Sequence, residues 1–174
     1  MKITSLLLKN FGSHVETRMS LADLGLVLLD GENKDAGGSN GSGKTTILSG
    51  ICWGLFGRTP EGLKANDVIR EGSYGCKVEI AVLLGEQNLV VSRSRGDSNK
   101  LKLKLDDVDT TGATNAETQK TLEALIGLDW PTFLSVVLFP QGGTGMAALS
   151  DAASKHVLDQ ILDLERFQQA HDKV

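Results

Sequence analysis

The sequence has few of the residues that stabilise small secreted or metal-bound folds. Its two cysteines, Cys52 and Cys76, are far apart and form no closely spaced pair, so neither a disulfide framework nor a zinc site is expected. No apolar run reaches the ~20 residues that a bilayer crossing requires, and the leucine run at 6–8 is too short for a signal-peptide core. We therefore expect a cytoplasmic protein without a membrane partner.

The chain also has no excess of positive charge. Its 18 Lys and Arg residues stand against 22 Asp and Glu, which gives a formal net charge of −4. This balance argues against a generally basic nucleic-acid coat protein, although it is compatible with a local positive face. The remaining composition is that of an ordinary globular protein, with 40% apolar residues, and the length of 174 residues suits one domain or one lobe.

Several segments have the pattern of β-strands. Short strands are expected at residues 2–9 and 15–21, and the continuous apolar run at 25–31 is typical of a buried parallel strand. Further along the chain, alternating residues separated by GEQN and GDSN turns predict an antiparallel β subdomain. Its three strands are expected at 76–84, 88–95 and 100–105.

Apolar residues at helical spacing predict a helix that starts at Lys44 and stops at Gly57. Gly50 and Gly54 lie inside this helix at a cost in helix propensity, which indicates close packing against a neighbouring backbone.

Three more helices are expected in the second half of the chain. Thr114 to Glu117 has the T-x-x-E form of a capping box, and a short helix should start near Pro131. Ser150 and Asp151 can cap a last helix, whose apolar residues recur to the end of the chain.

The sequence GGSNGSGKTT at residues 37–46 fits a phosphate-binding loop. Gly38, Gly43, Lys44 and Thr45 satisfy the pattern G-x-x-x-x-G-K-[ST], and the expected strand before it and helix after it supply the required context. Glycines let consecutive N–H groups curl around a phosphate, Lys44 should reach the β and γ phosphates, and the Thr45 hydroxyl should bind Mg²⁺. A flexible Gly/Ser linker is the alternative, and the flanking pattern disfavours it.

Hydrolysis needs carboxylates in addition, normally at the end of an apolar strand. LVLLDGE at 26–32 imitates such a strand, but it precedes the phosphate loop and is better interpreted as the strand that feeds it. The hydrolytic carboxylates are therefore expected from another segment or another chain.

Longer stretches resemble one family. NGSGKTT followed by GICWGLFGRT is similar to the N-terminal ATP-binding segment of the SMC superfamily of ABC-type ATPases, especially the SbcC-type ATPase of the double-strand-break repair nuclease. The opening KITSLLLKNFGSH resembles that family's first strand and turn, LIGLDWPTFLSVVLFPQGG its Q-loop approach, and HVLDQILDLERFQQ the helix that leads into its long coiled coil. The likeness covers nearly the whole chain.

The resemblance implies an α/β fold: a P-loop head lobe with a mixed sheet around the phosphate-loop helix, an antiparallel β subdomain, and a C-terminal helix entering a coiled coil. Residues 1–150 would be the lobe of the head and 151–174 the start of the coil.

The resemblance also implies a set of site residues for ATP and Mg²⁺. Gln141 takes the Q-loop role, in which it contacts Mg²⁺ or the attacking water and senses the γ phosphate. Lys44 is the second residue expected to take part in catalysis. The residues expected to hold the triphosphate are Gly38, Asn40, Gly41, Ser42, Gly43, Lys44, Thr45 and Thr46.

The partners implied by the family are the C-terminal half of the head, a second head, an SbcD-type nuclease subunit and double-stranded DNA. In such proteins the second half of the ATPase brings the signature motif, the metal-polarising carboxylates and the switch histidine, and ATP clamps two heads together. One alternative is a DNA-tethering head of the cohesin or condensin kind, whose partner is a kleisin. Another is a small monomeric P-loop kinase.

This sequence departs from the family at two places. Many relatives have a basic residue where Gly12 stands, which leaves Ser13 and His14 as the weaker candidates for a nucleotide contact from that turn. The stretch DGENKDAGG is longer than the usual link into the loop, and phage members of the family are the suggested source.

A basic patch is the last candidate feature. Lys100, Lys102 and Lys104 fall on one face of a strand, near Arg93 and Arg95. Such a face can contact duplex phosphates or be merely solvated.

Overall fold

The computed structural model describes residues 1–32, 37–39, 41–139 and 149–162. The chain divides into two compact units, Met1–Leu125 and Ile126–Val174. The first contains the sheet and the helix that follows the glycine-rich loop, and the second contains two short helices. None of the helices in the described ranges is long and apolar enough to cross a membrane.

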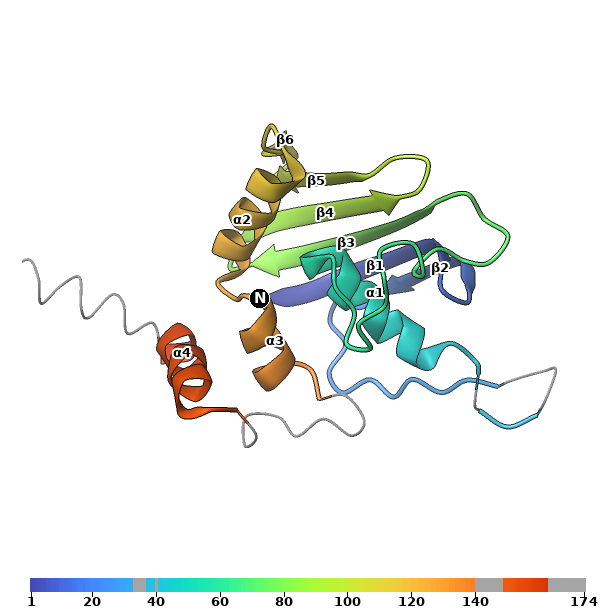
Figure 1. The fold of residues 1–174 in the computed structure, drawn as a ribbon, viewed down its shortest axis with the longest axis horizontal. Coiled ribbons are helices and arrows are strands. Elements are labelled where there is room, and N and C mark those ends of the chain that lie inside the picture. The colour runs from blue at the N-terminus through green and yellow to red at the C-terminus, as the bar shows by residue number, and fades with distance from the viewer. Residues whose placement is uncertain (33–36, 40, 140–148, 163–174) are drawn as a thin grey trace, which may run out of the picture. The chain divides into compact units, whose positions relative to one another are not determined.

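The first unit is built on a six-stranded antiparallel sheet, with the order β2-β1-β3-β4-β5-β6 (Figure 1). The α/β class and the antiparallel strands expected from the sequence are confirmed, and the same sheet also includes the two N-terminal strands. The strands are β1 (Lys2–Phe11), β2 (His14–Ser20), β3 (Cys76–Leu84), β4 (Gln87–Arg95), β5 (Lys100–Leu105) and β6 (Val108–Asp109).

One face of the sheet is apolar because the side chains alternate in register across the strands. Ile80 of β3 pairs with Val91 of β4, which pairs with Leu103 of β5, and all three are fully buried. Helix α1 (Lys44–Phe56) packs on this face, against β1, β3 and β4 (Figure 1). The glycine-rich loop is therefore attached to a helix that is held by the core.

Two glycines of α1 allow this helix to lie close to the strands. A β-carbon built on Gly50 would lie 2.5 Å from Leu8 Cδ2, and one built on Gly54 would lie 2.5 Å from Ile80 Cδ1. The close packing expected from these glycines is confirmed, but it is against side chains of the sheet and not against a neighbouring backbone. Gly57 ends the helix in the left-handed region, with φ of 67°, and donates its N–H to the Trp53 carbonyl.

Arg93 of β4 forms hydrogen bonds with the C-terminal end of α1. Its guanidinium donates to the carbonyl oxygens of Gly54 and Leu55 at 3.1 and 3.4 Å and to the Gln119 side chain, and it lies 5.9 Å from the centroid of the Trp53 ring. Burial lowers the pKa of Arg93 to about 10, so it stays charged at neutral pH. A cation at this position complements the negative end of the helix dipole.

The buried strand expected at residues 25–31 is not formed, and that prediction is wrong. These residues have no strand assignment, and the side chains of Leu26 and Leu28 are almost fully exposed, at 104% and 90%. The apolar run pairs with no strand among the described residues. A parallel strand needs a neighbour on at least one side for its N–H and C=O groups, so the run alone does not make a strand.

The helix α2 (Asn115–Ile126) begins with the predicted capping box. Glu117 N–H donates to Thr114 Oγ1 at 3.1 Å, and Thr114 N–H donates to a Glu117 carboxylate oxygen at 3.2 Å. Asn115 connects the start of this helix to the sheet, because its side-chain oxygen accepts from Leu101 N–H. Gly127 follows the helix with φ of 69°.

The second unit contains α3 (Trp130–Val136) and α4 (Asp151–Leu162). Asp129 caps α3 by accepting from Thr132 N–H at 2.9 Å, and its other oxygen is 2.8 Å from His156 Nε2 of α4. Ser150 Oγ accepts from Ala153 N–H at the start of α4. The starts predicted for both helices are confirmed, while the expected continuation of the last helix past residue 162 lies outside the described residues.

Both cysteines are free and buried. Burial raises the pKa of Cys52 to about 12 and that of Cys76 to about 11, so both remain protonated at neutral pH. Neither thiol is a nucleophile in this environment.

Candidate phosphate-binding site

The candidate site lies at the N-terminus of α1. Gly43 is the first residue outside the helix, with φ of 87°, and among the described residues no side chain caps it. The first turn contains no acidic residue. The N–H groups of the first turn of α1 therefore point out of the helix without side-chain acceptors. The helix dipole adds positive potential at this N-terminus. This is the arrangement in which a helix N-terminus binds a phosphate.

Lys44 is folded over the loop that precedes the helix. Its Nζ donates to the Ser39 carbonyl at 2.7 Å and to Ser42 Oγ at 3.2 Å, and Ser42 Oγ donates to the same carbonyl at 2.8 Å. The ammonium is thus next to the loop backbone. It is held by neutral oxygens, which an incoming phosphate oxygen can supplement or replace.

The threonines after the lysine differ in exposure. Thr45 is exposed in the first turn of α1, whereas Thr46 is half-buried under the turn between β1 and β2. An exposed hydroxyl at this position fits an Mg²⁺ site that is completed by phosphate oxygens and water, which is how this ion is usually bound. The described residues contain no group of three His, Cys, Asp or Glu side chains that would hold a metal by themselves.

The β1–β2 turn lies directly against the start of α1. Gly12 has φ of 52°, and a β-carbon there would collide with Thr46 Cγ2. His14 Nε2 is 3.1 Å from the Gly43 carbonyl oxygen. The absence of a side chain at Gly12 is thus explained by close packing. From the sequence, His14 was a candidate for a nucleotide contact from this turn. The structure shows its ring nitrogen at the Gly43 carbonyl, a partner that the sequence did not predict because nothing in the spacing connects positions so far apart in the chain.

The structure places most of the predicted phosphate-loop residues together. Gly38, Gly41, Ser42, Gly43, Lys44, Thr45 and Thr46 lie in the loop and in the first turn of α1. Asn40, which was predicted to hold the triphosphate, and Gln141, which was predicted to contact Mg²⁺ or the attacking water, lie outside the described residues.

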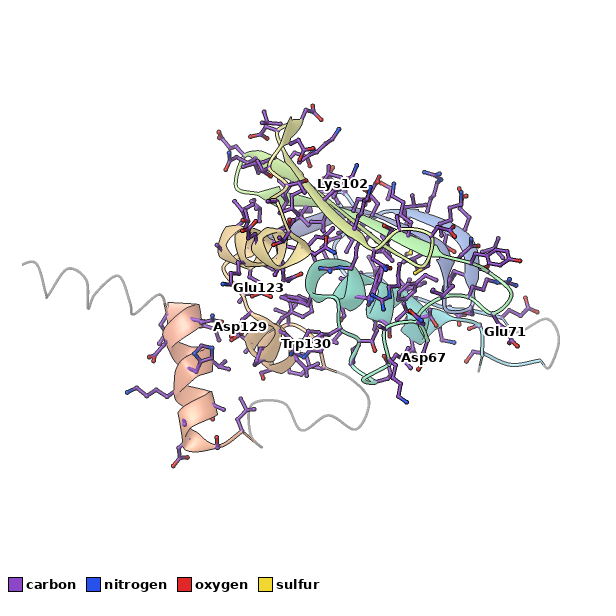
Figure 2. All side chains as sticks on the ribbon, turned by 45° about the horizontal axis from the view of Figure 1, so that its top comes forward. Asp67, Glu71, Lys102, Glu123, Asp129 and Trp130 are labelled. Carbon is purple, nitrogen blue, oxygen red and sulfur yellow. The ribbon has the colours of Figure 1, made fainter. Side chains whose placement is uncertain are left out.

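The basic patch is on the other face of the sheet. Along β5, Leu101 and Leu103 face the core, and Lys100, Lys102 and Lys104 alternate with them. Figure 2 shows Lys102 pointing away from α1. Arg93 and Arg95 belong to the core-side register, opposite Val78 and Cys76, so the five cations expected to lie together are divided between two faces.

Comparison with known proteins gives a family for the chain. A family model described as an AAA domain matches residues 5–174. A solved chain described as "Structural biochemistry of ATP-driven dimerization and DNA stimulated activation of SMC ATPases" superposes with a TM-score of 0.60 and 21% identity, covering 92% of this chain and 99% of the other. This likeness confirms the fold.

The chain is also similar in sequence to individual DNA-repair ATPases and nuclease subunits. The chain is 26% identical over 174 residues to the DNA double-strand break repair Rad50 ATPase of Thermococcus kodakarensis, and 32% identical over 155 residues to the SbcC component of the SbcCD nuclease of Deinococcus radiodurans. It is 26% identical over 130 residues to Exonuclease subunit 2 of Escherichia phage RB69. These matches cover 98%, 82% and 73% of this chain but only 19%, 16% and 23% of the relatives, so the chain spans less than a quarter of their length.

Proposed function

The chain belongs to the AAA domain family and is homologous to the Rad50 and SbcC ATPases, and on that premise we propose that it is the ATP-binding segment of a DNA-repair ATPase. The observation that carries this proposal is the start of α1: uncapped N–H groups, a left-handed glycine and a lysine ammonium meet there. Such a constellation binds the β and γ phosphates of a nucleoside triphosphate.

Each residue of the loop has a role in the proposal. The main-chain N–H groups from Gly38 to Thr46, including that of Asn40, surround the phosphates, and Lys44 neutralises charge at the γ phosphate. The Thr45 hydroxyl and Gln141 would hold Mg²⁺, whose positive charge would offset the negative charge of the phosphates. Gln141 would also orient the attacking water.

The proposal includes a complementing half of the head. The exposed run from Leu24 to Leu28 supports it, because an apolar segment just before a phosphate loop suits a strand that is completed by another polypeptide segment. The relatives are several times longer than this chain. We therefore assign the hydrolytic carboxylates and the signature motif to the C-terminal half, and a full site to two heads that dimerise around ATP.

The whole assembly would regulate a nuclease at double-strand DNA ends. The names of two relatives, one a component of the SbcCD nuclease and the other Exonuclease subunit 2, support a nuclease partner. Lys100, Lys102 and Lys104 form an exposed row that would contact duplex phosphates. Replacing all three with Ala should reduce the salt dependence of DNA binding, and an unchanged slope would remove this row from the interface.

Lys44→Ala tests the nucleotide site. ATP binding, measured by calorimetric titration with Mg²⁺, should become undetectable, since the compact cation that meets the triphosphate is lost. Lys102→Ala is the matched control, because it removes the same charge from the opposite face of the sheet and should leave the affinity unchanged. Wild-type affinity in the Lys44 variant would overturn the assignment of the site.

Reconstitution tests the complementing half. The chain alone should turn over ATP negligibly, and addition of a C-terminal half from the same protein should restore hydrolysis. Leu26→Asp with Leu28→Asp should block this restoration, while Leu63→Asp, at another exposed leucine, should not. Rapid turnover by the chain alone would refute the divided site. Recovery of a kleisin instead of a nuclease with the assembled heads would favour the DNA-tethering alternative.

A further inference from the structure

His14 lies between a neighbouring strand residue and the phosphate loop. Its Nε2 is 3.1 Å from the carbonyl oxygen of Gly43, and its Nδ1 is 2.8 Å from the Thr17 hydroxyl oxygen. A carbonyl oxygen only accepts, so Nε2 must carry a proton and donate to it. In the neutral imidazole, Nδ1 then accepts from the Thr17 hydroxyl. Both ring nitrogens are therefore used, and the ring is fixed at both ends.

The Gly43 carbonyl that accepts from His14 belongs to the peptide group at which α1 begins. Gly43 O also accepts from Ile47 N–H at 3.3 Å, which is the first hydrogen bond of α1. The other end of the same planar peptide unit is the N–H of Lys44, and in a trans peptide it points in the opposite direction to the carbonyl. A carbonyl directed along the helix thus directs the Lys44 N–H out of its N-terminus, toward the place of a phosphate.

Gly43 gives this peptide little resistance to turning. A left-handed glycine has wide conformational freedom, and the side chains of Ser42 and Lys44 beside it bond to the Ser39 carbonyl. The bond to Ile47 is long, at 3.3 Å. A second donor on the same oxygen therefore limits the orientations of the peptide before any ligand arrives. Binding a phosphate to an already oriented N–H avoids part of the ordering cost.

We infer that His14, oriented by Thr17, is a positioning residue of the phosphate loop, which holds the Gly43–Lys44 peptide so that its N–H faces the nucleotide's phosphates. This inference rests on the proposed function, since it concerns how the same site binds its ligand. His14 acts through the backbone and does not touch the nucleotide. Its effect should therefore fall on the phosphates that main-chain N–H groups bind, which ADP and ATP share.

Nucleotide affinity tests this role with four variants. His14→Ala should weaken ADP and ATP by the same factor, about threefold to tenfold, as expected for one lost hydrogen bond. His14→Gln should recover most of the affinity, because its amide nitrogen reaches as far as Nε2 and donates. Thr17→Val should give an intermediate loss. Glu16→Ala, an exposed change on the same strand, should have no effect.

Thermal unfolding of each variant separates positioning from stability. A loss of affinity that follows the unfolding temperature, or that Gln does not restore, would make His14 a merely structural residue. If wild-type protein and His14→Ala bind ADP equally, the inference is wrong while the nucleotide site stands. If wild-type protein binds neither ADP nor ATP, the proposed function fails.

Nuclear magnetic resonance tests the geometry without nucleotide. The imidazole ¹⁵N spectrum should show the neutral His14 ring protonated at Nε2, and His14→Ala should move the Lys44 amide resonance, with the change smaller in His14→Gln. A ring protonated at Nδ1, or a Lys44 amide that does not respond, would overturn the inference whatever the affinities.

Discussion

The strand β5 and the segment at residues 24–28 both carry leucine at every second position, but buried leucines occur only in β5. Both contain leucines at close spacing, but Leu101 and Leu103 of β5 are 2% and 0% exposed, whereas Leu26 and Leu28 are 104% and 90% exposed. β5 pairs with β4 along its length, and its leucines lie on the face that α1 covers. The apolar segment has no such partner among the described residues.

This difference shows that an apolar pattern and a neighbouring strand are both needed for a buried strand. Hydrophobic burial rewards a leucine only when other side chains surround it, and the backbone groups of a strand must be paired before they can be buried. β5 obtains both from a hairpin a few residues away, so its pairing is local. Residues 24–28 would have to obtain both from elsewhere, and under the proposed function that source is the C-terminal half of the head.

Truncating one leucine in each region should give the largest difference in the free energy of unfolding between β5 and residues 24–28. Leu103→Ala should lower the free energy of unfolding by about 2–5 kcal/mol, since it leaves a cavity in the core between the sheet and the helices. Leu28→Ala removes the same atoms from an exposed position and should change it by less than about 0.5 kcal/mol. Urea unfolding of both variants gives the two values. Similar losses in both would mean that Leu28 is buried in solution.

A second contrast compares a cation that is held by the core with one that is not. Arg93→Met should lower the free energy of unfolding by about 2 kcal/mol, because the Gly54 carbonyl and the Gln119 side-chain oxygen lose the guanidinium as a donor, while the Leu55 carbonyl keeps only the bond from Gln119 Nε2. Lys102→Met, on the exposed face of β5, is the matched control and should cost less than about 0.5 kcal/mol. If both variants lose the same free energy of unfolding, the hydrogen bonds of the Arg93 guanidinium stabilise the fold no more than the solvated ammonium of Lys102 does.

Much of the sheet could be predicted from the sequence, because its determinants are local. Period-two apolar residues and short turns define β3 and β5 to the residue, and the Thr114 and Glu117 pair locates the start of α2. Gly50 and Gly54 indicated close packing on a neighbour before that neighbour was known. In these cases the residues that decide the structure lie within one hairpin or one helix.

The errors have a shared physical cause, which is dependence on distant parts of the chain. The pattern at 25–31 predicted a strand but could not reveal that no partner strand lies beside it among the described residues. The contact of His14 with Gly43 depends on how the β1–β2 turn meets α1, which is a result of tertiary packing. Likewise, Arg93 looked like part of an exposed basic patch, although its register relative to β3 puts it on the core side.

The smallest effect on stability is expected at the pair of Asp129 and His156, whose side chains are only partly buried. Partial burial raises the pKa of Asp129, but the bonds from His156 and Thr132 outweigh it and hold that pKa below its usual value. A carboxyl with a depressed pKa stabilises the fold at pH values above its unfolded pKa of about 3.9, and this contribution is lost as the pH falls through the folded pKa. Asp129→Asn keeps a good cap for α3 but removes the charge.

The variant should therefore be less stable than wild type at neutral pH by about 0.5–1 kcal/mol, with the difference vanishing in acid, as expected for a pair whose side chains are partly exposed. Amide exchange in α3 and α4, followed between about pH 3 and pH 7, measures this difference within the second unit, and Asp159→Asn on α4 controls for the loss of a negative charge. A difference that persists in acid would assign the effect to the shape of the cap, and the comparison between partnered and unpartnered groups would then not extend to this ion pair.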